Sequence, residues 1–241
     1  MCKKNLIINN KKYLVDSYIR LAQGAISAAD EIKLIEPISI NGIPYNNLII
    51  KYKLHGSELN EHFLDVFSKL KEKNIPTFSF CIQGFFDGKP VFITENLNNR
   101  TKDVIYVSSN YHTKDSKEPV ILALLQSMGG INNIPEPKTE NQNSKEYYLS
   151  NNKLKKIVNI DETIQKGKEL ALNCYKNSIL LPDDSIFYGV DIVNSKIVDL
   201  VIGDYDTVSL QSIGLTQQDN IDSFMRTFDE FQLHFVEGYK Q

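Results

Sequence analysis

Two carboxylates stand one residue apart where an apolar stretch of the chain ends. The segment VDLVIGDYDTVSL covers residues 198–210, and it places Asp204 and Asp206 directly after Gly203. In a strand, residues i and i+2 face the same side, so the two side chains can converge on one cation. Carboxylate oxygens are ligands that Mg²⁺ prefers in proteins. The alternative interpretation is a solvated turn in which the acids only end the strand.

A lysine and three further acids stand next to other apolar stretches. Lys51 ends LIIK (48–51), Glu61 follows ten residues later, and Asp183 and Asp184 precede the stretch SIFYGVDIV. An ammonium group can orient phosphates, and a carboxylate beside it can hold it in place. Each residue also has a purely structural interpretation. Lys51 fits an exposed position on an edge strand, Glu61 a first-turn acid that favours the helix dipole, and the two aspartates a turn.

The elements that must position these residues follow from the periodicity of apolar side chains. Alternation and β-branched residues predict strands at 46–56, at 185–193 and 197–205, and in a hairpin over 77–97 that turns at Asp87-Gly88. Helical spacing predicts helices over 57–74, 120–128, 161–177 and 219–239. The first hundred residues are therefore expected to be mostly sheet with one helix. The polar segment 98–153 is expected to be a connector or lid.

The order of these elements resembles a protein kinase reduced to its minimum. A small sheet with one helix comes first, then a hinge, then a helix and a hairpin that ends in acids. RLAQGAISAADEI (20–32) resembles the glycine-rich turn, LIIK resembles the V-A-I-K strand, and GDYD (203–206) stands in the place of D-F-G. The resemblance implies an α+β, two-lobed protein-kinase-like fold with a truncated C-terminal lobe. Its parts would be 1–97, like the N-terminal lobe, 98–153, a connector or insert, and 154–241, a reduced C-terminal lobe.

The resemblance also implies ATP and Mg²⁺ as cofactors and a role for each candidate residue. It assigns nucleotide binding to Gly24, Ser27, Lys51, Glu61 and Glu95, the metal to Asp204 and Asp206, and the catalytic base to Asp184, with Asp183 as the alternate. The chain departs from the kinase pattern beside the base. Pro182 stands in place of the arginine, no histidine lies two residues upstream of either aspartate, and the asparagine for a second metal is missing.

These features favour phosphoryl transfer from ATP to a protein hydroxyl, as by a Ser/Thr kinase. Two alternatives stay open: a catalytically inactive kinase-like binding or regulatory module, and nucleotidyl (AMP) transfer. A nucleotidyltransferase needs Gly-Ser or Gly-Gly at a helix start, whereas Gly189-Val190 lies in a predicted strand. The short C-terminal part resembles small kinase effectors that pathogenic bacteria deliver into host cells. That resemblance implies a secreted virulence protein and a host partner that completes or activates the fold.

Composition bounds the class of protein. The chain has 241 residues, of which 41% are hydrophobic and 24% charged, enough for one large domain or two lobes. A net charge of −3, spread along the chain, argues against nucleic acid as a partner. No apolar stretch approaches the roughly 20 residues of a membrane span, and the N-terminus lacks the apolar core of a signal peptide. Three widely spaced cysteines predict neither disulfides nor a zinc site, so we expect a soluble, cytoplasmic-type protein.

Overall fold

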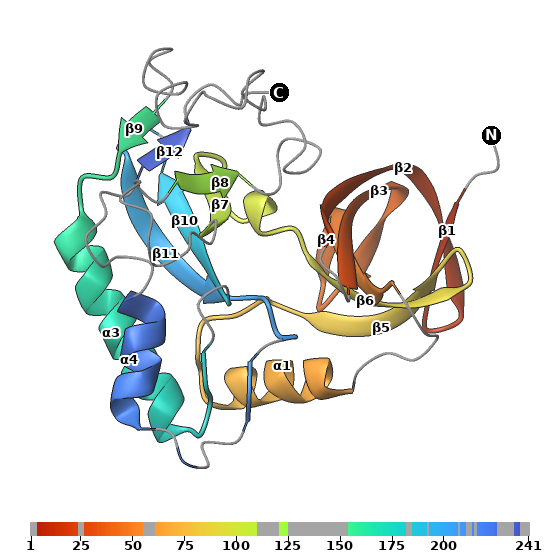
Figure 1. Ribbon diagram of the computed structural model, residues 1–241. Helices are drawn as coiled ribbons and strands as arrows, with labels where there is room; N and C mark the ends of the chain where they lie inside the picture. The colour runs from red at the N-terminus through yellow and green to blue at the C-terminus, as the bar shows by residue number, and fades with distance from the viewer. Residues whose placement is uncertain are drawn as a thin grey trace, which may run out of the picture.

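A closed antiparallel barrel forms the first part of the chain. The computed structural model describes residues 4–23, 27–54, 61–109, 121–124, 154–181, 185–191, 193–206, 208–210, 214, 216–225 and 234–236. The barrel strands are β1 (Asn5–Ile8), β2 (Lys11–Gln23), β3 (Ser27–Ile40), β4 (Ile43–Lys53), β5 (Cys81–Phe86) and β6 (Lys89–Glu95). They follow each other around the barrel in the order β1-β2-β3-β4-β6-β5 (Figure 1).

Three tight turns set the register of the barrel. Both turn residues have positive φ in Asn9-Asn10, Asn41-Gly42 and Asp87-Gly88. Two-residue turns of this kind match the right-handed twist of the strands they join. The hairpin predicted around Asp87-Gly88 is therefore confirmed.

The inner face of the barrel is an apolar core of its own. Its fully buried members include Leu6, Ile32, Leu48, Ile50 and Ile93. These residues alternate along their strands with outward-facing ones, as the two-residue period of a strand requires. The outer face of the barrel is thus free for other contacts, and Phe92 of β6 packs there against the rest of the molecule.

The remaining strands form a second six-stranded sheet. They are β7 (Val104–Ser109), β8 (Ile121–Leu124), β9 (Leu154–Lys156), β10 (Ile186–Asp191), β11 (Lys196–Ile202) and β12 (His234–Val236), in the order β11-β10-β7-β8-β12-β9. The helices are α1 (His62–Glu72), α3 (Ile160–Lys176) and α4 (Gln217–Met225), with a short 3₁₀ turn at Leu97–Asn99. Figure 1 shows α3 and α4 side by side, and α1 beneath the barrel.

A second apolar core joins the barrel to this sheet. It contains Phe63, Val66 and Leu70 of α1, Phe92 on the outside of the barrel, and Tyr188 of β10, together with buried residues of α3 and β11. The chain after α1 also pairs directly with the end of β11, where the Ile202 N–H donates to the Pro76 carbonyl at 2.9 Å. The end of β11 is therefore held against the outside of the barrel.

The expectation of an α+β, two-lobed protein-kinase-like fold with a truncated C-terminal lobe is wrong. The described chain is mostly β, with few helices, and its first sheet closes into a six-stranded barrel because β1 pairs with both β2 and β5. Two predicted helices contain strands: residues 121–124 form β8, and residues 234–236 form β12. Short apolar runs fit helix and strand equally well, and here the pairing of β12 with β8 and β9 decides for strand.

Candidate functional site

Lys51 lies near the end of β4 on the outer face of the barrel. Leu48 and Ile50 are fully buried in the barrel core, so alternation turns Lys51 outward, between its register partners Ala29 of β3 and Phe92 of β6. Its ammonium lies 5.4 Å from the centre of the Phe63 ring of α1. The lysine therefore stands where the barrel, α1 and the end of β11 meet.

The two aspartates after β11 converge on this lysine. Lys51 Nζ lies 2.6 Å from Asp204 Oδ1 and 2.8 Å from Asp206 Oδ2. The Ser27 hydroxyl, at the start of β3, donates to Asp206 Oδ2 at 2.8 Å. We call these four residues, Ser27, Lys51, Asp204 and Asp206, the Lys51 cluster. The structure thus brings together four of the residues that the sequence predicted for one site.

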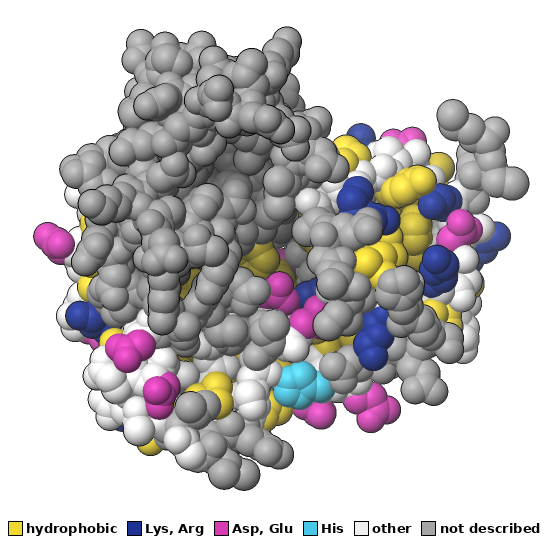
Figure 2. Space-filling view, in the orientation of Figure 1, with side chains coloured by type: hydrophobic (Ala, Val, Ile, Leu, Met, Phe, Trp, Pro, Cys, Tyr) yellow, Lys and Arg dark blue, Asp and Glu magenta, His cyan; other side chains and the backbone are white. Residues whose placement is uncertain are grey.

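The Lys51 cluster carries more negative than positive charge and is partly exposed to solvent. The two carboxylate side chains are 35% and 32% exposed, and the Lys51 side chain is 17% exposed. Burial alone would lower the pKa of the Lys51 ammonium, but Asp204 and Asp206 outweigh it and hold that pKa above its ordinary value. One ammonium facing two carboxylates leaves an excess negative charge. Figure 2 shows acidic side chains at the surface between the barrel and the rest of the molecule.

Tyr205, between the two aspartates, anchors them. Its side chain is fully buried, with its ring 4.6 Å from that of Phe63 and 5.7 Å from that of Phe78. The Tyr205 hydroxyl hydrogen-bonds to the Thr77 hydroxyl, which donates to the Ile202 carbonyl at 2.8 Å. Burial raises the pKa of Tyr205, so the phenol stays neutral. Because Tyr205 points inward, its two neighbours are directed toward Lys51.

Gly203 allows this close packing at the end of β11. A Cβ at this position would lie 2.3 Å from Phe187 Cε2 and 2.9 Å from Phe78 Cζ. Only a residue without a side chain lets the backbone approach both rings. The glycine that precedes the two acids in the sequence therefore has a packing role.

Glu61 does not lie beside Lys51. It is exposed just before α1, which begins at His62, and it lines a groove with Gln83 and Phe85. Within the part of the chain that the structure describes, the carboxylates that pair with Lys51 are those of Asp204 and Asp206. The sequence spacing from Lys51 did not indicate which carboxylates would face it.

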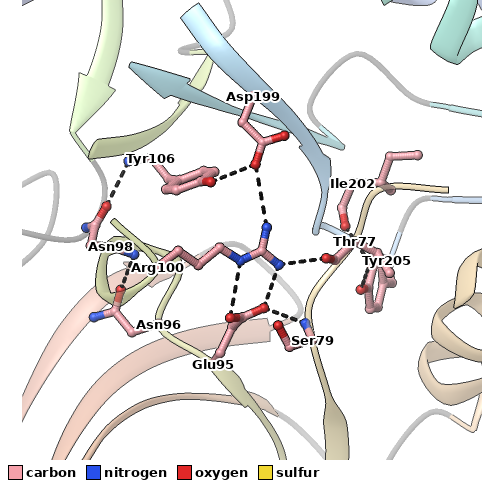
Figure 3. A network of polar contacts seen from close by, with 10 residues as sticks. All are labelled: Thr77, Ser79, Glu95, Asn96, Asn98, Arg100, Tyr106, Asp199, Ile202 and Tyr205. Atoms are coloured by element: carbon pink, nitrogen blue, oxygen red, sulfur yellow. Dashed lines mark hydrogen bonds and ion pairs between the residues drawn. The ribbon is translucent and has the colours of Figure 1, made fainter. Parts of the chain in front are cut away.

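Glu95 belongs to a different polar network, at the junction of the barrel and the second sheet (Figure 3). Its side chain is 4% exposed and pairs with Arg100, with Nη2 to Oε1 at 2.6 Å and Nε to Oε2 at 3.2 Å. Glu95 also accepts a hydrogen bond from the Ser79 backbone. Arg100 reaches Asp199 of β11 at 3.6 Å, and Tyr106 donates to Asp199 at 2.6 Å. The structure thus gives Glu95 a partner other than the Lys51 cluster.

Three further predicted residues lie outside the described part of the chain: Gly24, Asp183 and Asp184. Sequence reasoning also missed residues that support the site. Tyr205 had a usable signal, because alternation turns it away from the faces of Asp204 and Asp206. Thr77, which bonds to the Tyr205 hydroxyl, had none, since its contacts depend on the distant end of β11. The same holds for His62, whose Nε2 lies 2.6 Å from the carbonyl oxygen of Val208.

The Lys51 cluster can supply two ligands to a hard cation. Among the described residues, no group of three or more His, Cys, Asp or Glu side chains is placed to hold a metal. Mg²⁺ commonly takes one or two carboxylates and completes its shell with water and substrate phosphates. Asp204 and Asp206 fit that donor set, with a phosphate-bearing ligand supplying the remaining oxygens.

Comparison with known proteins leaves the chain unassigned: no family model matches it, and no curated protein matches it. Among the described helices, none has the length and apolar character that crossing a membrane requires.

Cys81 and Cys174 are buried free thiols, and burial raises the pKa of each to about 12. The chemistry of the Lys51 cluster is therefore what points to a function.

Proposed function

We propose that the Lys51 cluster binds the phosphates of Mg-ATP and that the protein transfers a phosphoryl group from ATP to a protein hydroxyl. One observation carries the proposal: the Lys51 ammonium lies 2.6 Å and 2.8 Å from two carboxylates that are each about a third exposed. A donor for phosphate oxygens and two ligands for Mg²⁺ thus meet at one accessible point.

Binding would exchange the partners within the cluster. Mg²⁺ would become the counter-ion of Asp204 and Asp206, and the Lys51 ammonium would turn to the phosphate oxygens. The metal and the ammonium together would neutralise the charge that develops on the phosphates during transfer. Ser27, which bonds to Asp206 at 2.8 Å, would hold that carboxylate in place. The acceptor would be a hydroxyl of a partner protein. Its oxygen would form the new bond to the γ-phosphorus as the bond to the β-phosphate oxygen breaks, ADP would leave, and the hydroxyl proton would pass to solvent.

A second candidate function is nucleotide binding without transfer. It is favoured by the position of Glu61, which does not pair with Lys51. Among the described residues, the carboxylate partners of Lys51 are Asp204 and Asp206, the two proposed ligands of Mg²⁺. With no other acid to hold it, the ammonium has to be oriented by the nucleotide itself. Such a protein would bind Mg-ATP as a structural or regulatory ligand.

Thermal unfolding with Mg-ATP tests the binding step. A ligand that binds only the folded state stabilises it by RT ln(1 + [L]/Kd). We expect Mg-ATP to raise Tm more than ATP with a chelator does, and Asp204→Asn to remove the difference because an amide is a poor ligand for Mg²⁺. Lys33→Met, an exposed lysine on β3, is the matched charge control and should behave as the wild type. If Mg-ATP gives no stabilisation, the cluster is an ion-pair network and the proposal is wrong.

Labelled ATP tests the transfer step. The protein is incubated with Mg²⁺ and either γ-labelled or α-labelled ATP, with a cell lysate as the source of acceptor proteins. Phosphoryl transfer predicts protein-bound label from the γ position only. Label from the α position would show AMP transfer. Stabilisation by Mg-ATP without any protein-bound label would show that the protein binds the nucleotide without transferring a group from it.

A further inference from the structure

A groove with no role in the proposed function lies on the outside of the barrel. It has a volume of about 740 Å³, and its walls come from β1, the β1–β2 turn, β5, the start of β6 and the residue before α1. None of the four residues of the Lys51 cluster lines it. This volume falls within the range of roughly 300–1,000 Å³ that is usual for small-molecule sites.

The floor of the groove is an apolar strip across three strands. Phe85 of β5 is paired in register with Ile7 of β1 on one side and with Pro90 of β6 on the other. Phe86 points into the barrel core, so alternation turns Phe85 outward, and it is 50% exposed. An aromatic ring is thus presented to solvent with an aliphatic neighbour on each side.

The rim of the groove carries polar side chains without partners in the described structure. They are the carboxamides of Asn9, Asn10 and Gln83 and the carboxylate of Glu61. No hydrogen bond or ion pair joins these side chains to another described residue. A carboxamide both donates and accepts, so this rim can meet a ligand whose groups do the same.

Two of the carboxamides stand on a rigid support. Asn9 and Asn10 have φ values of 49° and 63°, and they form the two-residue turn between β1 and β2. Turns of this type have a defined backbone that is locked by the flanking strand pairs. The backbone that carries the two carboxamides is therefore ordered before binding, so only their side-chain rotamers have to be fixed when a ligand binds.

We infer that this groove binds a neutral oligosaccharide. The C–H groups on one face of a sugar ring are drawn to the negative face of an aromatic ring, which Phe85 presents. Sugar hydroxyls both donate and accept, as carboxamides do. Among the described lining residues there is one acid, Glu61, and no lysine or arginine, so the walls do not favour an anionic ligand. Its volume of about 740 Å³ is large enough for more than one sugar ring.

A binding panel tests the inference on the full chain. Saturation-transfer NMR and calorimetry are run with neutral di- and trisaccharides of glucose, galactose, mannose and N-acetylglucosamine, and with heparin-derived fragments as charged probes. We expect at least one neutral sugar to bind with a Kd below about 1 mM. Binding by none of them, or by the charged fragments alone, would overturn the inference.

Variants then place the site. Phe85→Ala should weaken binding of the selected sugar by about tenfold or more, because it removes the stacking surface. Gln83→Ala should weaken it several-fold while leaving the apolar floor intact. Val198→Ala, which alters a 48% exposed residue of β11, is the control and should bind like the wild type. Sugar binding that survives both Phe85→Ala and Gln83→Ala would contradict the assignment. Asp204 does not line the groove. The Asp204→Asn variant should therefore still bind the sugar even if it no longer binds ATP.

Discussion

At the scale of single residues, Lys51 has two roles that can be separated. It lies between Asp204 and Asp206, so it screens the repulsion of two like charges and ties the segment after β11 to the barrel. The pair is partly exposed, so solvent screening reduces the energy of these contacts. If Lys51 only held the segment after β11 against the barrel, Asp204 and Asp206 would not need to be accessible to a ligand.

Lys51→Met should reveal the cation site that the lysine now fills. We expect the free energy of unfolding to fall by about 1–2 kcal/mol, because two adjacent carboxylates lose their counter-ion. Mg²⁺ without nucleotide should then raise Tm more in Lys51→Met than in the wild type, since the metal can take the place of the ammonium. Thermal unfolding over a Mg²⁺ titration measures this. Equal responses in Lys51→Met, wild type and Lys33→Met would show that the two acids do not hold a cation.

At the scale of elements, the end of β11 is the piece that aims the acids. Tyr205 is held between α1 and Phe78, and the Ile202 N–H donates to the Pro76 carbonyl at 2.9 Å. The acids therefore stand on a backbone that is fixed from two sides. A change that shifts this backbone should affect the site without altering any charged residue.

Gly203→Ala should make that shift. Its Cβ would lie 2.3 Å from Phe187 Cε2, so a ring or the backbone must move, at a cost of about 1–3 kcal/mol. Urea unfolding measures this loss, and the Mg-ATP-dependent rise in Tm should shrink together with it. Gly214→Ala is no equivalent control because Gly214 has a φ of 80°. Val198→Ala on the same strand serves instead and should leave both quantities unchanged. A Gly203→Ala protein with wild-type stability would mean that the Phe187 and Phe78 rings move aside freely.

At the scale of the whole molecule, the Arg100 network joins the barrel to the second sheet. Arg100 pairs with buried Glu95 at the end of β6, donates to the Thr77 carbonyl at 2.8 Å, and lies 3.6 Å from Asp199 of β11. The guanidinium can make these contacts together because it carries several donors in one plane. Two parts of the fold therefore depend on one side chain.

Arg100→Met should destabilise the whole fold. It leaves the Glu95 carboxylate buried without its cation, which costs about 3–5 kcal/mol. Denaturant unfolding should show this loss, and adding Glu95→Gln to the variant should recover part of it because the amide carries no charge. Lys166→Met, which removes an exposed i,i+4 partner of Glu162, should cost less than about 0.5 kcal/mol. If Arg100→Met lost as little stability as Lys166→Met, the Arg100 network would not be what holds the barrel and the second sheet together.

The sequence by itself determined several of the local elements. Alternation located β4, the hairpin of β5 and β6, and the pair β10 and β11, and helical spacing located α1 and α3, because each of these patterns is written in neighbouring residues. It also singled out Lys51, Asp204 and Asp206, whose side-chain type and position at a strand end were informative without any knowledge of the fold. Ser27 entered only through the resemblance of residues 20–32 to a glycine-rich turn.

Tertiary structure decided the rest. Closure of the barrel depends on the four-residue strand β1, which pairs with β2 along its length and with β5 through Leu6 and Ile7. The short runs of β8 and β12 become strands because they pair with each other and with β7 and β9. Glu61 and Glu95, which the sequence placed with Lys51, have other surroundings. The partners of Lys51 lie 153 and 155 residues further along the chain. Such contacts leave no periodic trace in the sequence, because which distant strands meet is set by the packing of the whole core.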